Sequence, residues 1–143
     1  MGRRLGRPGD AAPFVVDDEW TSALPFERLP KGIIHLPLEC VMYVPSTQGD
    51  RVISAEEFAA RRDEAADILS SLFGGCRESL ATGRYRGKDG EIVAEEVAVL
   101  TGFGDADDYE RKRKEFLAWL IDKRDEWGQE TLGFEFEGDL WYL

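Results

Sequence analysis

The chain has 143 residues, 43% of them hydrophobic, which fits one folded domain with a buried core and excludes disorder over most of its length. Its formal net charge is -11, and residues 32–143 account for all of it, with 13 Lys and Arg against 24 Asp and Glu. Such a surface repels phosphates, so we expect no direct binding of nucleic acid and no attraction to anionic lipid.

Cysteine and histidine are scarce, since the chain has two cysteines, Cys40 and Cys76, and one histidine, His35. These residues lack the spacing of a zinc site, so we expect neither a metal site nor a cofactor. No stretch of the sequence is long and apolar enough to cross a membrane, and the first residues lack the apolar run of a signal peptide. We therefore expect a cytoplasmic protein with two reduced thiols and no contact with membranes.

The N-terminal part divides into two segments. Residues 1–12 are rich in Gly, Arg, Pro and Ala, a composition typical of a disordered arm. Residues 13–31 are too apolar for a free linker, and their three prolines forbid a long helix. We expect 13–31 to be an extended segment that packs on its own domain or on a partner, and residues 32–143 to form a single α+β domain.

The first half of that domain reads as strand, helix and strand. The residues of 33–44 alternate, and the set that includes Cys40 and Met42 is apolar throughout, which predicts a strand with one buried face. Ser54 and Glu57 form a capping box that begins a helix, and Gly74-Gly75 ends it. Residues 79–86 predict the second strand.

The second half reads as strand, helix and strand. Asp89-Gly90 is a hairpin signal, and it is followed by a third strand over residues 91–101. The pattern leaves open which face of this strand is buried. Asp105 can cap a second helix that ends at Gly128, and residues 130–143 predict the last strand.

This order of elements predicts an α+β fold, the ferredoxin-like βαββαβ sandwich, in which a four-stranded antiparallel sheet of order 4-1-3-2 carries two helices on one face. Over residues 38–143 the chain also resembles a set of small uncharacterised bacterial proteins. The resemblance is carried by Tyr43-Val-Pro-Ser-Thr47, Phe73-Gly-Gly75, Gly83-x-Tyr85, Glu95 and Trp127-Gly-Gln129. It implies a fold without implying an activity.

The sheet face without helices is the first place to expect chemistry. In the predicted layout it gathers His35, Glu39 and Tyr43, together with Glu135, Glu137 and one of Glu95 or Glu96. A histidine among carboxylates can supply acid–base groups or bind a divalent cation. Strand alternation alone would also produce an acidic, solvated face.

A second candidate is a small-anion site. Its residues are hydroxyls, free amides beside glycine and one arginine: Ser46, Thr47, Gly74, Gly75 and Arg77. The phosphate-loop and dinucleotide-binding patterns are absent, and the glycine pair is equally explained as a helix end.

No motif in the sequence names a reaction. A sheet with helices on one side leaves its other side to be covered, which favours a non-catalytic interaction or regulatory module that forms a homodimer or binds a basic protein partner. The alternatives are a small enzyme that uses His35, Glu39 and Tyr43, and an acidic decoy of a nucleic-acid-binding protein.

Overall fold

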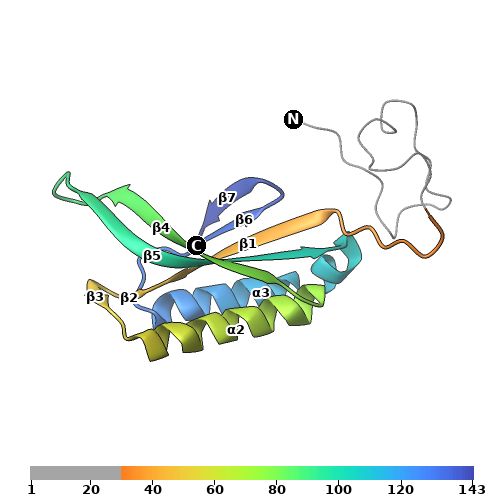
Figure 1. The fold of residues 1–143 in the computed structure, drawn as a ribbon, viewed down its shortest axis with the longest axis horizontal. Coiled ribbons are helices and arrows are strands. Elements are labelled where there is room, and N and C mark those ends of the chain that lie inside the picture. The colour runs from red at the N-terminus through yellow and green to blue at the C-terminus, as the bar shows by residue number, and fades with distance from the viewer. Residues whose placement is uncertain (1–29) are drawn as a thin grey trace.

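The computed structural model describes residues 30–143 (Figure 1). The arm expected at residues 1–12 and nearly all of the apolar segment expected at residues 13–31 lie outside the described residues. The fold is α+β. Its elements are β1 (Leu38–Pro45), β2 (Thr47–Gln48), β3 (Arg51–Val52), α2 (Ala55–Phe73), β4 (Arg77–Arg86), β5 (Ile92–Gly104), α3 (Ala106–Glu126), β6 (Gly133–Phe136) and β7 (Asp139–Tyr142).

The main sheet has five antiparallel strands in the order β4-β5-β1-β6-β7, and α2 and α3 lie along one of its faces (Figure 1). The predicted four-stranded ferredoxin-like sheet is therefore wrong. The residues expected to form one last strand fold back on themselves at Glu137 and Gly138, whose φ angles are 55° and 85°. Phe136 then pairs with Asp139, and the returning residues add β7 at the edge of the sheet.

A small hairpin of β2 and β3 occupies the region expected to be a polar loop after the first strand. Thr47 pairs with Val52 across this hairpin, and Gly49 turns the chain with φ 60°. The hairpin lies at the end of the molecule where α2 begins (Figure 1).

Both helices begin at the side chains that the sequence indicated. Ser54 accepts a hydrogen bond from the backbone N–H of Glu57 at 3.1 Å, and Asp105 accepts one from the N–H of Asp108 at 2.8 Å. Gly74 ends α2 in the left-handed conformation, with φ 82°.

The core lies between the helices and the sheet. Ala98 and Leu100 face it from β5, which settles which face of that strand is buried. Its largest fully buried side chains come from both layers: Cys40, Met42, Val44, Leu69, Leu100, Phe116 and Leu120. Burying each large apolar side chain contributes roughly 1.5–3 kcal/mol, so this cluster holds the two layers together.

Two glycines of β5 let the end of α2 approach the sheet. A Cβ atom built on Gly102 would lie 2.7 Å from the ring of Phe73, and one on Gly104 would lie 2.2 Å from it. Neither glycine has a positive φ, so close packing, and not backbone conformation, requires glycine at these positions.

Replacing Gly104 by alanine should therefore lower the free energy of unfolding by about 1–3 kcal/mol, because Phe73 or the strand has to move. Gly75→Ala is the matched control, since a Cβ atom there meets nothing within 4 Å and its φ is not positive. Urea denaturation of both variants measures the difference. Equal midpoints for the two variants would show that Phe73 does not pack as described.

Candidate functional site

The sheet face without helices carries a row of side chains that crosses all five strands. The register pairs Arg77 with Thr101, Thr101 with Val41, Val41 with Glu135, and Glu135 with Leu140. Directly paired residues of an antiparallel sheet point to the same face. The row therefore runs β4, β5, β1, β6, β7, with a cation toward one end and a carboxylate toward the other.

The floor of this face is buried although no helix covers it. Val41 is 8% exposed and Thr101 is 7% exposed, and Val97 and Val99 beside them are partly buried. The sheet is twisted, and in Figure 1 the β4–β5 and β6–β7 hairpins both rise away from the helices. The sheet therefore curves around this side, which we call the hollow face, and the buried or partly buried residues of β1 and β5 form its floor.

Tyr43 and Glu135 form a hydrogen-bonded pair on this face. The Tyr43 hydroxyl, on β1, donates to Oε2 of Glu135, on β6. Burial, followed by this hydrogen bond and the charge of Glu135, raises the pKa of Tyr43 to about 12. At neutral pH Tyr43 is therefore a protonated donor held beside a carboxylate.

The structure does not bring the predicted trio of His35, Glu39 and Tyr43 together. His35 lies before β1 begins, and Glu39 and Tyr43 are four residues apart on one strand, a distance of about 13 Å. The group that meets Tyr43 is Glu135, which the sequence placed on the same face but did not pair with the tyrosine.

The residues of the predicted anion site lie at opposite ends of α2. Ser46 and Thr47 precede the helix, and Gly74 and Gly75 follow its 19 residues, a length of about 28 Å. Ser46 Oγ already donates to the carbonyl of Glu96 at 2.6 Å. Arg77, the fifth residue of that set, belongs to the hollow face.

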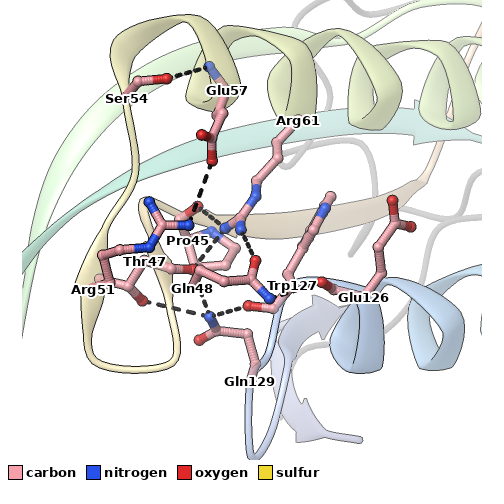
Figure 2. A network of polar contacts seen from close by, with 10 residues as sticks. All are labelled: Pro45, Thr47, Gln48, Arg51, Ser54, Glu57, Arg61, Glu126, Trp127 and Gln129. Carbon is pink, nitrogen blue, oxygen red and sulfur yellow. Dashed lines mark hydrogen bonds and ion pairs between the residues drawn. The ribbon is translucent and has the colours of Figure 1, made fainter.

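A buried arginine fixes the end of the molecule where Pro45 and Thr47 lie (Figure 2). Arg61 of α2 is 6% exposed, and it donates to the carbonyls of Pro45 at 2.9 Å and Thr47 at 2.8 Å and to Oε1 of Gln48 at 2.6 Å. Its guanidinium also lies 5.2 Å from the centre of the Trp127 ring. Burial lowers the pKa of Arg61, but a guanidinium remains charged throughout the pH range of folded proteins.

The same network reaches the C-terminal end of α3 and the hollow face. Gln129 donates to the carbonyl of Thr47 at 2.9 Å, and Gln48 donates to the carbonyl of Glu126 at 3.0 Å. The hydroxyl of Thr47 donates to Glu95 of β5 at 3.4 Å. Glu95, and not Glu96, lies on the same face as Val97 and Val99. Since Thr47 donates a hydrogen bond to Glu95, the network supports one end of the candidate site.

The sequence analysis did not identify Arg61, although its position carried a signal. It lies between Phe58 and Ala65 at helical spacing, so it falls on the inward stripe of α2 among buried apolar residues. An arginine on such a stripe needs acceptors inside the fold, and here the acceptors are backbone carbonyls.

Within residues 30–143, the structure contains no group of three or more His, Cys, Asp or Glu side chains placed to hold a metal ion. None of the described helices is long and apolar enough to cross a membrane.

Comparison of the sequence with protein families and with curated proteins finds no match. Comparison of the fold with solved structures finds a phage SAM lyase in complex with S-methyl-5′-thioadenosine, with a TM-score of 0.53 and 16% identity over 74% of this chain and 88% of that one. A phage SAM lyase in its apo state has a TM-score of 0.48 and 14% identity, over 74% and 87% of the two chains. At such identities the likeness extends to the fold alone.

This finding corrects the expectation of a non-catalytic interaction or regulatory module, because the fold that the chain shares is that of an enzyme. The expectation rested on the argument that a bare sheet face must be covered by a partner. In the structure part of that face is already buried within the single chain, since Val41 is 8% exposed and Thr101 is 7% exposed.

The raised pKa of Tyr43 predicts how stability depends on pH. Since the folded pKa of about 12 exceeds the ordinary value of 10.0, the tyrosine contributes its full stability below pH 10 and loses it as the pH rises toward 12. The difference between the ultraviolet titration curves of the wild type and Tyr43→Phe should show one phenol with a midpoint near 12. A midpoint near 10 would show that the pair with Glu135 does not form.

The network around Arg61 predicts a large cost for its removal. Arg61→Met should lower the free energy of unfolding by about 2–4 kcal/mol, because buried carbonyls lose their donor. Arg62→Met is the control at the next position, where a half-exposed ion pair with Glu78 at 2.8 Å contributes less than about 1 kcal/mol. Chemical denaturation compares the two variants, and similar losses would argue against Arg61 as the anchor.

Proposed function

We propose that the protein is a small enzyme whose active site is the hollow face of the sheet, with Tyr43 and Glu135 at its centre. The observation that carries the proposal is the hydrogen-bonded Tyr43–Glu135 pair beside the buried floor of Val41 and Thr101. A sheltered apolar surface with a few convergent polar groups is the usual form of a small-molecule site.

The charges of this face favour an organic cation as substrate. The carboxylates of Glu39, Glu95 and Glu135 share the face, and the net charge of -11 raises the local concentration of cations. The rings of Tyr43 and Tyr142 add aromatic surface, which attracts cations and stacks on flat rings. A sulfonium that carries an adenosine, such as SAM, has both properties, and the fold shared with a phage SAM lyase supports this substrate class.

The chemistry of a SAM lyase fits such a surface. When the bond between sulfur and the amino-acid chain breaks, its electron pair stays on sulfur and the neutral thioether S-methyl-5′-thioadenosine is released. The substrate's own carboxylate oxygen forms the new bond to the carbon that sulfur leaves, which closes a lactone, so no water or further reactant is required. The positive charge on sulfur disappears along the reaction, so a site that withholds water from the sulfur favours the transition state over the charged substrate. Val41 and Thr101 would supply the water-poor surface, while the protonated Tyr43 keeps the carboxylate of Glu135 in place.

Cys40 is buried, Cys76 is exposed, and both are free, which supports the reducing cytoplasm as the place where we propose that the enzyme acts. The homodimer and the basic protein partner stay predictions.

Incubation of the purified chain with SAM tests the proposed function, with S-methyl-5′-thioadenosine followed by liquid chromatography. We expect the wild type to form this product and Glu135→Gln to form it at least tenfold more slowly. Glu115→Gln, which removes an exposed carboxylate from α3 by the same chemical change, should act like the wild type. Failure of the wild type to cleave SAM would refute this activity, and an unchanged rate for Glu135→Gln would refute the site.

A further inference from the structure

Arg77 is a cation for which the described part of the chain offers no anion. It begins β4 on the hollow face, and its guanidinium carbon lies 5.6 Å from the centre of the Phe103 ring. Arg62 and Arg124 lie against the carboxylates of Glu78 and Asp125, whereas Arg77, like Arg84 further along the same strand, makes no ion pair within residues 30–143. An unpaired guanidinium beside the proposed active site is therefore available to an anion of the substrate.

The register places this cation opposite the carboxylate of Glu135. Arg77 and Glu135 belong to one cross-strand row, with Thr101 and Val41 between them. Three strand spacings separate their Cα atoms, a distance of about 14 Å. The buried floor lies between them, with the guanidinium of Arg77 beside the ring of Phe103 and the carboxylate of Glu135 held by the hydroxyl of Tyr43.

The contact with Phe103 prepares the guanidinium for this role. A planar guanidinium beside an aromatic ring is less free to rotate and still presents its N–H groups at its edge. That edge matches a carboxylate, which arginine binds through two parallel hydrogen bonds.

We propose that Arg77 and Glu135 form a clamp for an α-amino acid group, in which Arg77 binds the carboxylate and Glu135, supported by Tyr43, binds the ammonium. This inference rests on the proposed function for the identity of the ligand and deepens it, because it names the part of the substrate that the site recognises. The clamp binds the amino-acid part of SAM, which the product S-methyl-5′-thioadenosine lacks. Loss of these contacts on bond cleavage would favour release of the product.

Two stable thioethers distinguish the affinity that the clamp contributes from the affinity that the rest of the site contributes. S-adenosylhomocysteine carries the amino-acid part, S-methyl-5′-thioadenosine lacks it, and both have neutral sulfur. Isothermal titration calorimetry with each compound would use the wild type, Arg77→Gln and Arg84→Gln. Arg84 is the matched control, because it lies on the same strand, is exposed, and has the opposite parity, so its side chain points to the other face.

We expect the wild type to bind S-adenosylhomocysteine at least tenfold more tightly than S-methyl-5′-thioadenosine. Arg77→Gln should abolish this preference by weakening only S-adenosylhomocysteine, and Arg84→Gln should keep it. Equal affinity of the wild type for the two compounds, or a preference that survives in Arg77→Gln, would overturn the clamp. Equal weakening of both compounds in Arg77→Gln would also overturn it, because Arg77 would then act on the nucleoside part or on the fold. Cleavage of SAM by the wild type reports separately on the proposed function.

Discussion

The central strand β1 buries residues on both of its faces, and the rest of the molecule depends on how the two faces are sheltered. Cys40, Met42 and Val44 point to the helices and are fully buried in the common core. Val41 and Tyr43 point the other way, where no helix lies. The hairpins on either side of β1 rise away from the helices (Figure 1), Val41 on this side is buried, and Tyr43 donates a hydrogen bond to Glu135 on the same side.

The Arg61 network keeps one end of that hollow in shape. The guanidinium of Arg61 is buried among α2, the β2–β3 hairpin and the residues after α3. These segments can take few other relative positions, because each acceptor of the guanidinium is a particular carbonyl or amide oxygen. Thr47 connects this network to Glu95 on the hollow face. Rigid support behind a site is what holds its polar groups at a fixed distance from a ligand.

Local signals in the sequence were sufficient for the helices and for the placement of Tyr43 and Glu135 on one face. The caps at Ser54 and Asp105 act within a few residues, and strand alternation needs no knowledge of the partner strand. The hairpin of β6 and β7 was missed because Glu137 takes a positive φ that glutamate rarely adopts, although Gly138 beside it is a turn residue. The Tyr43–Glu135 pair and the row from Arg77 to Leu140 depend on the register between distant strands, which alternation does not determine.

Titration of the isotopically labelled chain with S-methyl-5′-thioadenosine, followed by amide NMR shifts, tests most directly whether ligands bind on the hollow face of the sheet. We expect the largest shifts at Val41, Val99 and Thr101, on the floor of that face. The outer surface of the helices offers a second hollow, lined by Glu64, Asp67, Ile68, Ser71 and Trp119. Shifts confined to that groove, or no shifts anywhere, would contradict the claim.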